Sequence, residues 1–278
     1  MKKWLWSIPC VILLIVLIAW IAWDNQALEV NEWTVSDRDI PDTFSGYRIA
    51  QISDLHNAEF GGHNEELLSM LAGTAPDIIV LTGDLVDSRR TDVDVAADFA
   101  ARAMEIAPVY YVTGNHENRL KTEFPKLEKR LKNAGVTVLR NESVVLEQDG
   151  QQIQLLGVDD ITFYTKNWED PLIEDLERLK ADDLYTVLLS HRPDLLKLYE
   201  KAGVDLVFTG HAHGGQIRLP WIGGILAPDQ GFFPKYDSGL YTLGETNLMV
   251  SRGLGNSLFP FRVNNPPEIV VVELTTTN

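Results

Sequence analysis

The segment VDLVFTGHAHGGQ, residues 204–216, decides the fold class and indicates where the functional edge of the protein lies. It begins with the largely apolar run VDLVF and continues into His211 and His213, which are one residue apart and flanked by glycines. A short apolar run bounded by turn residues predicts a buried β-strand. In open α/β sheets, ligands bind beyond the carboxyl ends of the strands. The two histidines therefore follow their strand at the position where a site forms.

The same arrangement recurs along the chain on both sides of this segment. Strand-like apolar runs alternate with helix-like patterns, which predicts an α/β fold in one domain from about residue 28 onward. After His213 the helical pattern stops, and short strand-like pieces broken by Gly and Pro follow. The predicted strands are 28–35, 47–52, 78–81, 109–112, 153–156, 185–189, 204–208 and 268–274, and the predicted helices are 64–72, 93–106, 125–134, 171–181 and 193–201.

Five of the predicted strands end in polar residues that are able to bind metal ions. The endings are SDLH (53–56), GDLVD (83–87), GNHE (114–117), SHR (190–192) and GHAH (210–213), and they contain five of the six histidines. Taken singly, a strand-end Asp is an ordinary cap or turn residue. Together, Asp, Asn and His without thiolates suit divalent Mn, Fe, Zn or Co. The endings supply enough ligands for two such ions, which could share a bridging carboxylate and acidify a water molecule.

In this order, the motifs DLH, GDLVD, GNHE, SH and GHAH resemble the five signature motifs of the calcineurin-like metallophosphoesterases. The sequence GHAHGGQIRLP, with the later GLG and PPEI, is similar to the membrane-anchored bacterial branch of that superfamily. The resemblance extends from about residue 47 to 274. It implies a four-layer α/β/β/α sandwich of two mixed sheets flanked by helices, and hydrolysis of phosphate esters by a hydroxide that bridges two metals.

The resemblance also implies a ligand set for the two divalent ions. One ion would be bound by Asp54, His56 and His213, the other by Asn115, His191 and His211, and Asp84 would bridge them.

The resemblance further implies that His116 faces the substrate, where it would protonate the leaving oxygen or stabilise the phosphoryl charge. Asp87 and Glu117 would orient the loops and the imidazole rings.

Glu117 stands where the branch usually has Asp, and GNHE with GDLVD is also similar to the protein serine/threonine phosphatases. Those enzymes continue with Arg-Gly, whereas this chain continues with Ser88 before two arginines, so protein phosphatase activity is the minor alternative. We expect Arg89 and its neighbour Arg90 in a solvated loop.

The N-terminal segment from Trp4 to Trp23 contains 20 residues without a charged side chain. This length predicts an uncleaved membrane-spanning helix within residues 1–23, followed by a catalytic domain at 24–278. The alternatives are a buried core helix and a cleaved signal peptide, although no small-residue cleavage site follows. Lys2 and Lys3 precede the span and no basic residue follows until Arg38, which predicts a single-pass cell-membrane protein with its domain outside the cytoplasm.

The net charge of −16 argues against nonspecific binding to nucleic acid, which requires a basic surface. We expect a monomer whose substrate is a phosphodiester, pyrophosphate or phosphomonoester. The apolar residues of segment 221–236 leave two interpretations open: they pack a hairpin onto the sandwich, or they contact a membrane that carries lipid-linked substrates. A scaffold or adaptor whose metals are not catalytic is the alternative to an enzyme.

Overall fold

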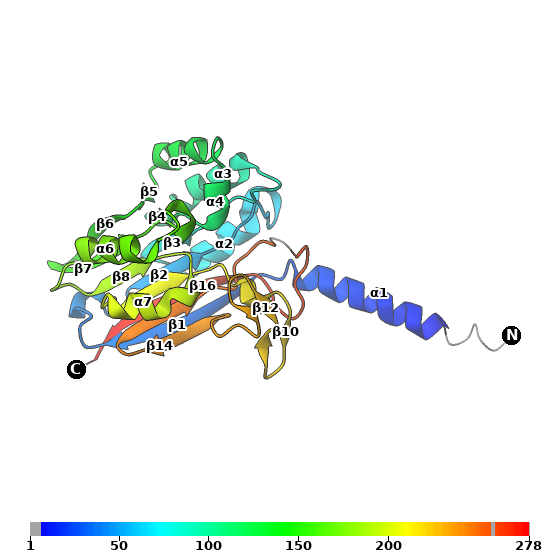
Figure 1. Cartoon of the computed structure of the whole chain (residues 1–278). Helices are drawn as coiled ribbons and strands as arrows, with labels where there is room; N and C mark the ends of the chain where they lie inside the picture. Colours follow the sequence, from blue (N-terminus) through cyan, green and yellow to red (C-terminus); the bar gives the residue numbers. More distant parts are fainter. Residues whose placement is uncertain (1–6, 257–258, 278) are drawn as a thin grey trace.

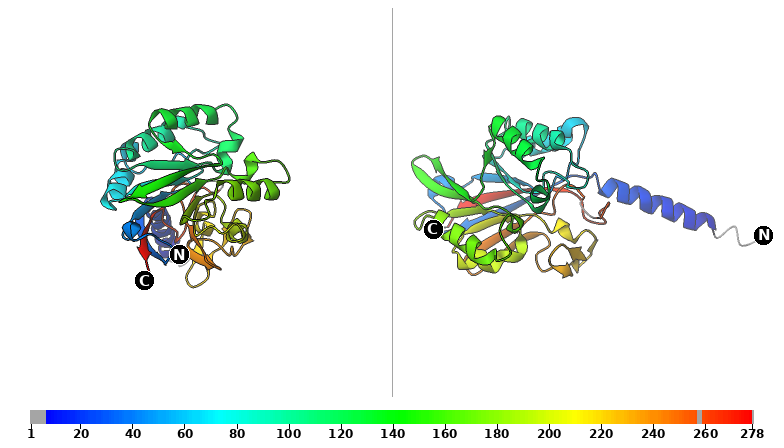
Figure 2. Two further views of the ribbon diagram at one scale, coloured as in Figure 1. Left: turned by 90° about the vertical axis from the view of Figure 1, so that its left-hand side faces the viewer. Right: turned by 45° about the horizontal axis from the view of Figure 1, so that its top comes forward.

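The computed structural model describes residues 7–256 and 259–277 (Figure 1). Two six-stranded mixed sheets pack face to face, and helices cover their outer faces (Figure 2). The predicted α/β fold with two mixed sheets flanked by helices is confirmed.

The first sheet has the strand order β1-β16-β2-β3-β4-β5. Strands β2, β3, β4 and β5 run parallel, whereas β16, from the C-terminal end of the chain, lies antiparallel to β2 and parallel to β1. The strands are β1 Glu29–Asp37, β2 Arg48–Ile52, β3 Ile78–Thr82, β4 Val109–Val112, β5 Thr137–Val138 and β16 Glu268–Thr276. Helices α2 Glu65–Gly73, α3 Val93–Ala103 and α5 Phe124–Asn133 lie on its outer side, and the short α4 Asn115–Arg119 follows β4.

The second sheet has the order β14-β15-β9-β8-β7-β6. Strands β7, β8, β9 and β15 are parallel, and β6 and β14 form antiparallel edges. The strands are β6 Glu142–Gln148, β7 Gln151–Gly157, β8 Thr186–Leu189, β9 Leu206–Thr209, β14 Gly239–Leu243 and β15 Thr246–Val250. Helices α6 Glu169–Leu179 and α7 Leu196–Lys201 pack outside it, and the 3-10 turns are Asp42–Phe44, Gly62–Asn64, Ile161–Phe163, Pro193–Leu195 and His213–Gly215.

The hydrophobic core has three layers, and strand β3 contributes to two of them. Its residues Ile78 and Val80 belong to the core between the two sheets, whereas Ile79 and Leu81 belong to the core under α2, α3 and α5. Successive side chains of a strand point to opposite faces, so a strand buried on both faces is apolar throughout. A third cluster fills the space between the second sheet and α6 and α7.

The N-terminal helix differs from the prediction. Helix α1 covers Ser7–Asp24 and projects from the sandwich (Figure 1), while Trp4 to Trp6 of the predicted span lie outside the described residues. Among the described residues, no helix is long and apolar enough to cross a bilayer. The last residue of α1, Asp24, is buried against the domain and accepts a hydrogen bond from the backbone N–H of Asn265.

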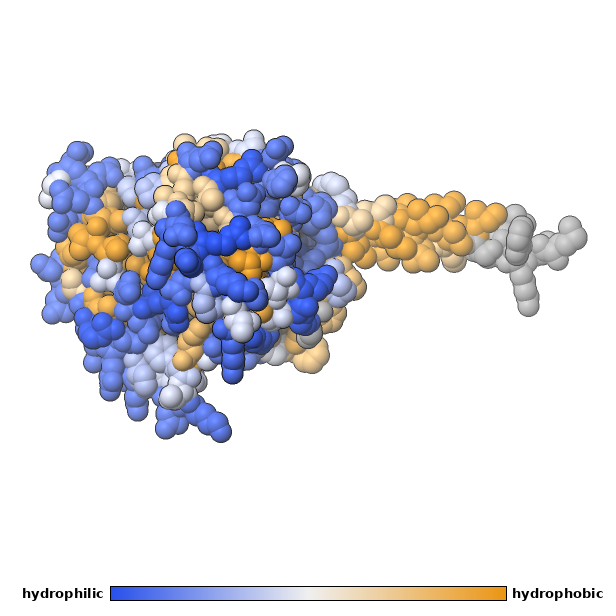
Figure 3. Space-filling model, turned by 90° about the horizontal axis from the view of Figure 1, so that it is seen from above, coloured by the Kyte–Doolittle hydropathy of each residue, from blue (hydrophilic) through white to orange (hydrophobic). Residues whose placement is uncertain are grey.

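The predictions of a single-pass anchor and of a cell-membrane location with an extracytoplasmic domain are therefore wrong for the described part of the chain. Viewed from above, α1 is apolar over its visible surface, while much of the sandwich surface is hydrophilic (Figure 3).

A segment of short ribbons, residues 217–236, separates the second sheet's β9 from β14. It contains β10 Arg218–Leu219, β11 Gly223–Gly224, β12 Leu226–Ala227 and β13 Gly231–Phe232, and we call it the ribbon segment. Of the two interpretations left open for its apolar residues, packing onto the sandwich agrees with Tyr236, which is buried. It does not describe four large side chains that are exposed: Trp221, Ile222, Phe232 and Phe233.

Candidate metal centre

The five polar strand endings meet at one edge of the sandwich. They follow the carboxyl ends of β2, β3 and β4 in the first sheet and of β8 and β9 in the second. Because the two sheets stack with these ends together, loops distant in the sequence converge there. All eight predicted site side chains are buried at this edge: Asp54, His56, Asp84, Asn115, His116, His191, His211 and His213.

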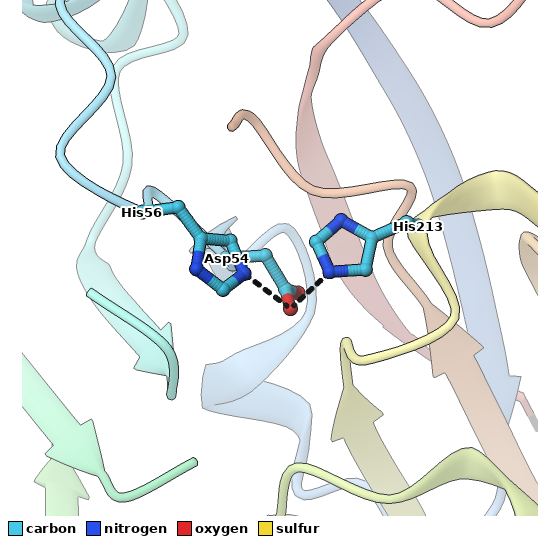
Figure 4. Close-up of side chains that lie close together, drawn as sticks. All are labelled: Asp54, His56 and His213. Carbon is cyan, nitrogen blue, oxygen red and sulfur yellow. Dashed lines mark ion pairs between the residues drawn. The ribbon is translucent and has the colours of Figure 1, made fainter. Parts of the chain in front are cut away.

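One cluster consists of Asp54, His56 and His213, whose potential ligand atoms all lie within 4.8 Å of one another. The Nε2 atoms of His56 and His213 lie 3.8 Å and 3.4 Å from Asp54 Oδ1. Figure 4 shows both rings pointing at the carboxylate from opposite sides. The two imidazoles are stacked, with ring centroids 5.1 Å apart. We call this group the first cluster.

A second cluster consists of Asp84, His191 and His211. His191 Nε2 lies 3.4 Å from Asp84 Oδ2 and 3.2 Å from His211 Nδ1. The other ring nitrogen of His191 donates to the Thr82 carbonyl at 2.7 Å, so its Nε2 lone pair faces the cluster. Asp84 Oδ2 is also 3.6 Å from His56 Nε2. The Asp84 carboxylate therefore lies between the two clusters.

Two buried polar atoms at this edge suit a bound cation. Asn115 Oδ1 and His56 Nε2 have no hydrogen-bond partner among the described residues. Buried polar atoms are normally hydrogen-bonded, so such exceptions call for an explanation. Carboxylate, amide and imidazole groups without thiolates form a donor set suited to Mn, Fe, Zn or Co. The residues present therefore fit two divalent ions.

The two carboxylates and His213 have the protonation states that metal binding requires, whereas His191 has to lose a proton. Burial favours the neutral carboxyl forms of Asp54 and Asp84, but the surrounding imidazoles outweigh it and hold both pKa values below their usual range. Burial lowers the pKa of His213 to about 3, so its ring is neutral near neutral pH. Burial also lowers the pKa of His191, but Asp84 reverses this and raises it to about 10. A cation at the second cluster would displace that proton from His191.

The backbone at these positions is unusual. Five of the seven predicted ligands have left-handed φ values: 52° at Asp54, 46° at His56, 52° at Asp84, 65° at His211 and 48° at His213. Non-glycine residues rarely adopt this conformation, and clusters of it occur at functional sites. Glycine at position 210 is required for a different reason, because a Cβ there would lie 2.2 Å from Asp54 Oδ2.

His116 lies at the mouth of this edge. Its backbone N–H donates to Asp84 Oδ1 at 2.8 Å, and its Nδ1 accepts from the Ser88 backbone N–H at 2.9 Å. The Ser88 N–H only donates, and its contact is shorter than that of Arg119, another donor, whose Nη1 lies 3.3 Å from Nε2. We therefore assign the proton of the neutral ring to Nε2, which lies 4.0 Å from Asp84 Oδ2. Burial lowers the pKa of His116 to about 4, which keeps the ring neutral.

Glu117 holds two of the loops in register. Its carboxylate accepts from the backbone N–H groups of Asp84 at 3.0 Å, Leu85 at 2.9 Å and Gly114 at 2.7 Å. Burial, followed by the charge of Asp84, raises its pKa to about 7. Asp87 accepts from the Arg89 backbone N–H at 2.7 Å. The orienting roles expected of Glu117 and Asp87 stay predictions.

A cavity of about 590 Å³ opens over the two clusters. Besides the predicted residues, the cavity is lined by six further residues, of which only Arg192 belongs to a predicted strand ending: Arg89, Arg119, Thr162, Arg192, Pro228 and Asp229. Arg89 and Arg90 are both exposed, as expected, and Arg89 also lines the cavity. The motifs contain no signal for Asp229, because it reaches the cavity from the ribbon segment rather than from a strand ending.

The arrangement agrees with what known proteins share with this chain. A family model described as calcineurin-like phosphoesterase matches residues 47–215. An uncharacterized metallophosphoesterase, YkuE of Bacillus subtilis, is 34% identical over 92% of this chain and 88% of its own length. The phosphodiesterase YaeI of Escherichia coli is 30% identical over 84% of each chain.

Among solved structures, the sulfate thiohydrolase SoxB of Thermus thermophilus superposes with a TM-score of 0.51 at 13% identity. The match covers 85% of this chain and 58% of SoxB, and it indicates a shared fold alone.

Proposed function

Since the chain belongs to the calcineurin-like phosphoesterase family, we propose that it hydrolyses phosphodiesters at the edge formed by β2, β3, β4, β8 and β9. Membership of this family makes the chain a metal-dependent phosphoester hydrolase. A diester as the substrate is supported by the relative YaeI, which is named a phosphodiesterase. Pyrophosphates and phosphomonoesters are the alternative substrates within the same chemistry.

The position of Asp84 between the two clusters is the observation that supports this proposal most strongly. In the proposed arrangement Asp54, His56 and His213 bind one ion, Asn115, His191 and His211 bind the other, and Asp84 contacts both. The two ions, when bound, supply positive charge for the phosphoryl oxygens and acidify an attacking water molecule.

The protein itself contributes a hydrogen-bond donor, His116, and a fixed arrangement of the loops that carry the site residues. His116 presents Nε2–H to the cavity, because Ser88 fixes the opposite nitrogen as an acceptor. In this role the neutral ring donates to an oxygen of the phosphoryl or leaving group. Glu117 keeps the loops that carry Asp84 and His116 at a fixed separation through its three backbone contacts.

Hydrolysis of bis-p-nitrophenyl phosphate by the purified protein tests this function. After removal of bound metal with a chelator, the rate is expected to fall below about 1% and to return on addition of Mn²⁺. p-Nitrophenyl phosphate in a parallel assay compares the diester with the monoester. A protein that binds Mn²⁺ but turns over neither compound would be a metal-binding scaffold, and the proposal would be wrong.

A further inference from the structure

We propose that Asp229, in the ribbon segment, is a positioning residue for the second metal ion. Its carboxylate holds the imidazole of His211 in the tautomer whose Nδ1 lone pair faces Asp84 and His191. This inference rests on the two-metal arrangement proposed above, and it extends the site to a residue outside the five motifs.

The two nitrogens of His211 have partners on opposite sides of the ring. Nε2 lies 2.8 Å from Asp229 Oδ2, and Nδ1 lies 3.2 Å from His191 Nε2. An ionised carboxylate only accepts hydrogen bonds, so the contact with Asp229 places the ring proton on Nε2. Nδ1 is then left with a free lone pair directed at the second cluster, as a metal ligand requires.

Arg192 is a competing hydrogen-bond donor to the ring nitrogen of His211 that Asp229 contacts. Its Nη1 lies 3.0 Å from the same His211 Nε2, and a guanidinium only donates hydrogen bonds. In the absence of Asp229, Arg192 would donate to Nε2 and leave the ring proton on Nδ1, where it would block a cation. Asp229 accepts from Arg192 Nη1 as well as lying against His211. Its carboxylate thus contacts both groups, which without it would pair with each other in the wrong tautomer.

Arg192 cannot easily turn away from this contact, because it is buried and held from behind. Its Nε donates to Asp160 Oδ2 at 2.6 Å, and Asp160 is itself buried. The guanidinium is therefore fixed in orientation, with Nη1 directed at the cavity. Because this donor is fixed beside His211, a predicted metal ligand, Asp229 is needed as the acceptor that contacts both side chains.

Asp229 is a positioning residue and not an additional ligand to the same ion. It contacts the ring nitrogen opposite the one that faces Asp84 and His191, and the lone pairs of those nitrogens diverge. It reaches the cavity from the turn between β12 and β13, with a backbone φ of 57°. Binding of the second ion should therefore depend on the ribbon segment as well as on the strand endings.

Mn²⁺ binding to Asp229→Ala tests the inference, measured by calorimetry and by electron paramagnetic resonance of the full chain. One of two Mn²⁺ ions is expected to bind about 10- to 100-fold more weakly, while the affinity of the other is unchanged. The spectrum should change from that of a coupled ion pair to that of an isolated ion. Adding Arg192→Met to Asp229→Ala should restore part of the lost affinity, because the competing donor is removed.

Asp237→Asn, directly after the ribbon segment, is the matched control. Unlike the exposed Asp229, Asp237 is a buried acid, and it holds the ribbon segment together because it accepts from the Gly224 backbone N–H at 2.6 Å and from Arg218, but it does not contact a predicted ligand. This variant should bind two Mn²⁺ ions as the wild type does. Equal weakening in Asp237→Asn, or unchanged binding in Asp229→Ala, would overturn the inference. A wild-type protein that binds fewer than two ions would instead refute the two-metal function.

Discussion

The two clusters contain the same kinds of side chain but are supported differently. In the second cluster each imidazole has an outer hydrogen-bond partner: His191 contacts the Thr82 carbonyl and His211 contacts Asp229. In the first cluster the outer Nδ1 atoms of His56 and His213 have no partner among the described residues. Outer partners fix the ring orientation and raise ligand basicity. We therefore expect the second cluster to bind its ion more tightly than the first.

Replacing Asp84, the proposed shared ligand, should have the largest effect, because both clusters should then fail to hold their ions. Asp84→Ala is expected to lose both ions and all measurable activity, because it deletes the carboxylate between the clusters and leaves two cations facing each other unshielded. Elemental analysis of the purified variant measures the metal content. Two ions per chain in this variant would refute the bridging role.

Replacing His116 should lower the rate of hydrolysis without changing metal binding at either cluster. His116→Ala is expected to keep both ions and to lose about 10²- to 10⁴-fold in rate, since Nε2–H no longer donates to the reacting group. Substrates with good leaving groups should suffer less, because the negative charge on their leaving oxygen needs less stabilisation by a donated hydrogen bond. An equal loss for good and poor leaving groups would indicate that the ring positions the substrate or stabilises its charge.

Single-ligand variants should reveal the difference between the clusters directly. In a Mn²⁺ titration the wild type should show a tight and a weaker phase, separated by about tenfold or more in affinity. His213→Ala should remove the weaker phase and leave the tight one, and His211→Ala should do the reverse. If both variants removed the same phase, the comparison of the two clusters would be wrong.

Replacing Asp205, a carboxylate far from both clusters, should change the stability of the fold but not metal binding. Asp205 precedes β9, at the end of the strand opposite the two clusters, and burial followed by the charge of Asp37 raises its pKa to about 6. Between the unfolded and folded pKa values the native state binds more protons, so stability falls as pH rises from about 4 to about 6. Asp205→Asn should remove that slope and add about 1 kcal/mol near neutral pH, a figure discounted for partial exposure. Thermal melting across this pH range is the measurement, and Mn²⁺ affinity should not change.

The sequence revealed the site more readily than the architecture around it. Each ligand follows an apolar run, and the carboxyl ends of parallel strands meet, so the residues could be expected to converge. The assignment of strands to two sheets came from the resemblance, because a strand such as β3 is apolar on both faces and does not indicate its neighbours. The half-exposed edge strands β6 and β14 lack such runs and were not predicted individually.

The missed residues and the wrong prediction have separate physical causes. Arg119 and Asp229 reach the cavity from the end of α4 and from the ribbon segment, whose paths no periodicity describes. The predicted membrane span included Trp4 to Trp6, which lie outside the described residues, and no described helix is long and apolar enough to cross a bilayer. The described part of the helix ends at Asp24, which the domain binds.

Strand β16 lies between β1 and β2, so the last described strand completes the sheet that the first described strand begins. During synthesis, β1 is made well before its described partner at residues 268–276, which follows all five motifs. Until then β2 has an unpaired edge and β1 has no neighbour in the sheet, which is the kind of surface that promotes aggregation. A prematurely terminated chain would carry all five metal-binding motifs without a closed sheet to support them. Such products should be substrates for chaperones and proteases rather than partly active enzymes.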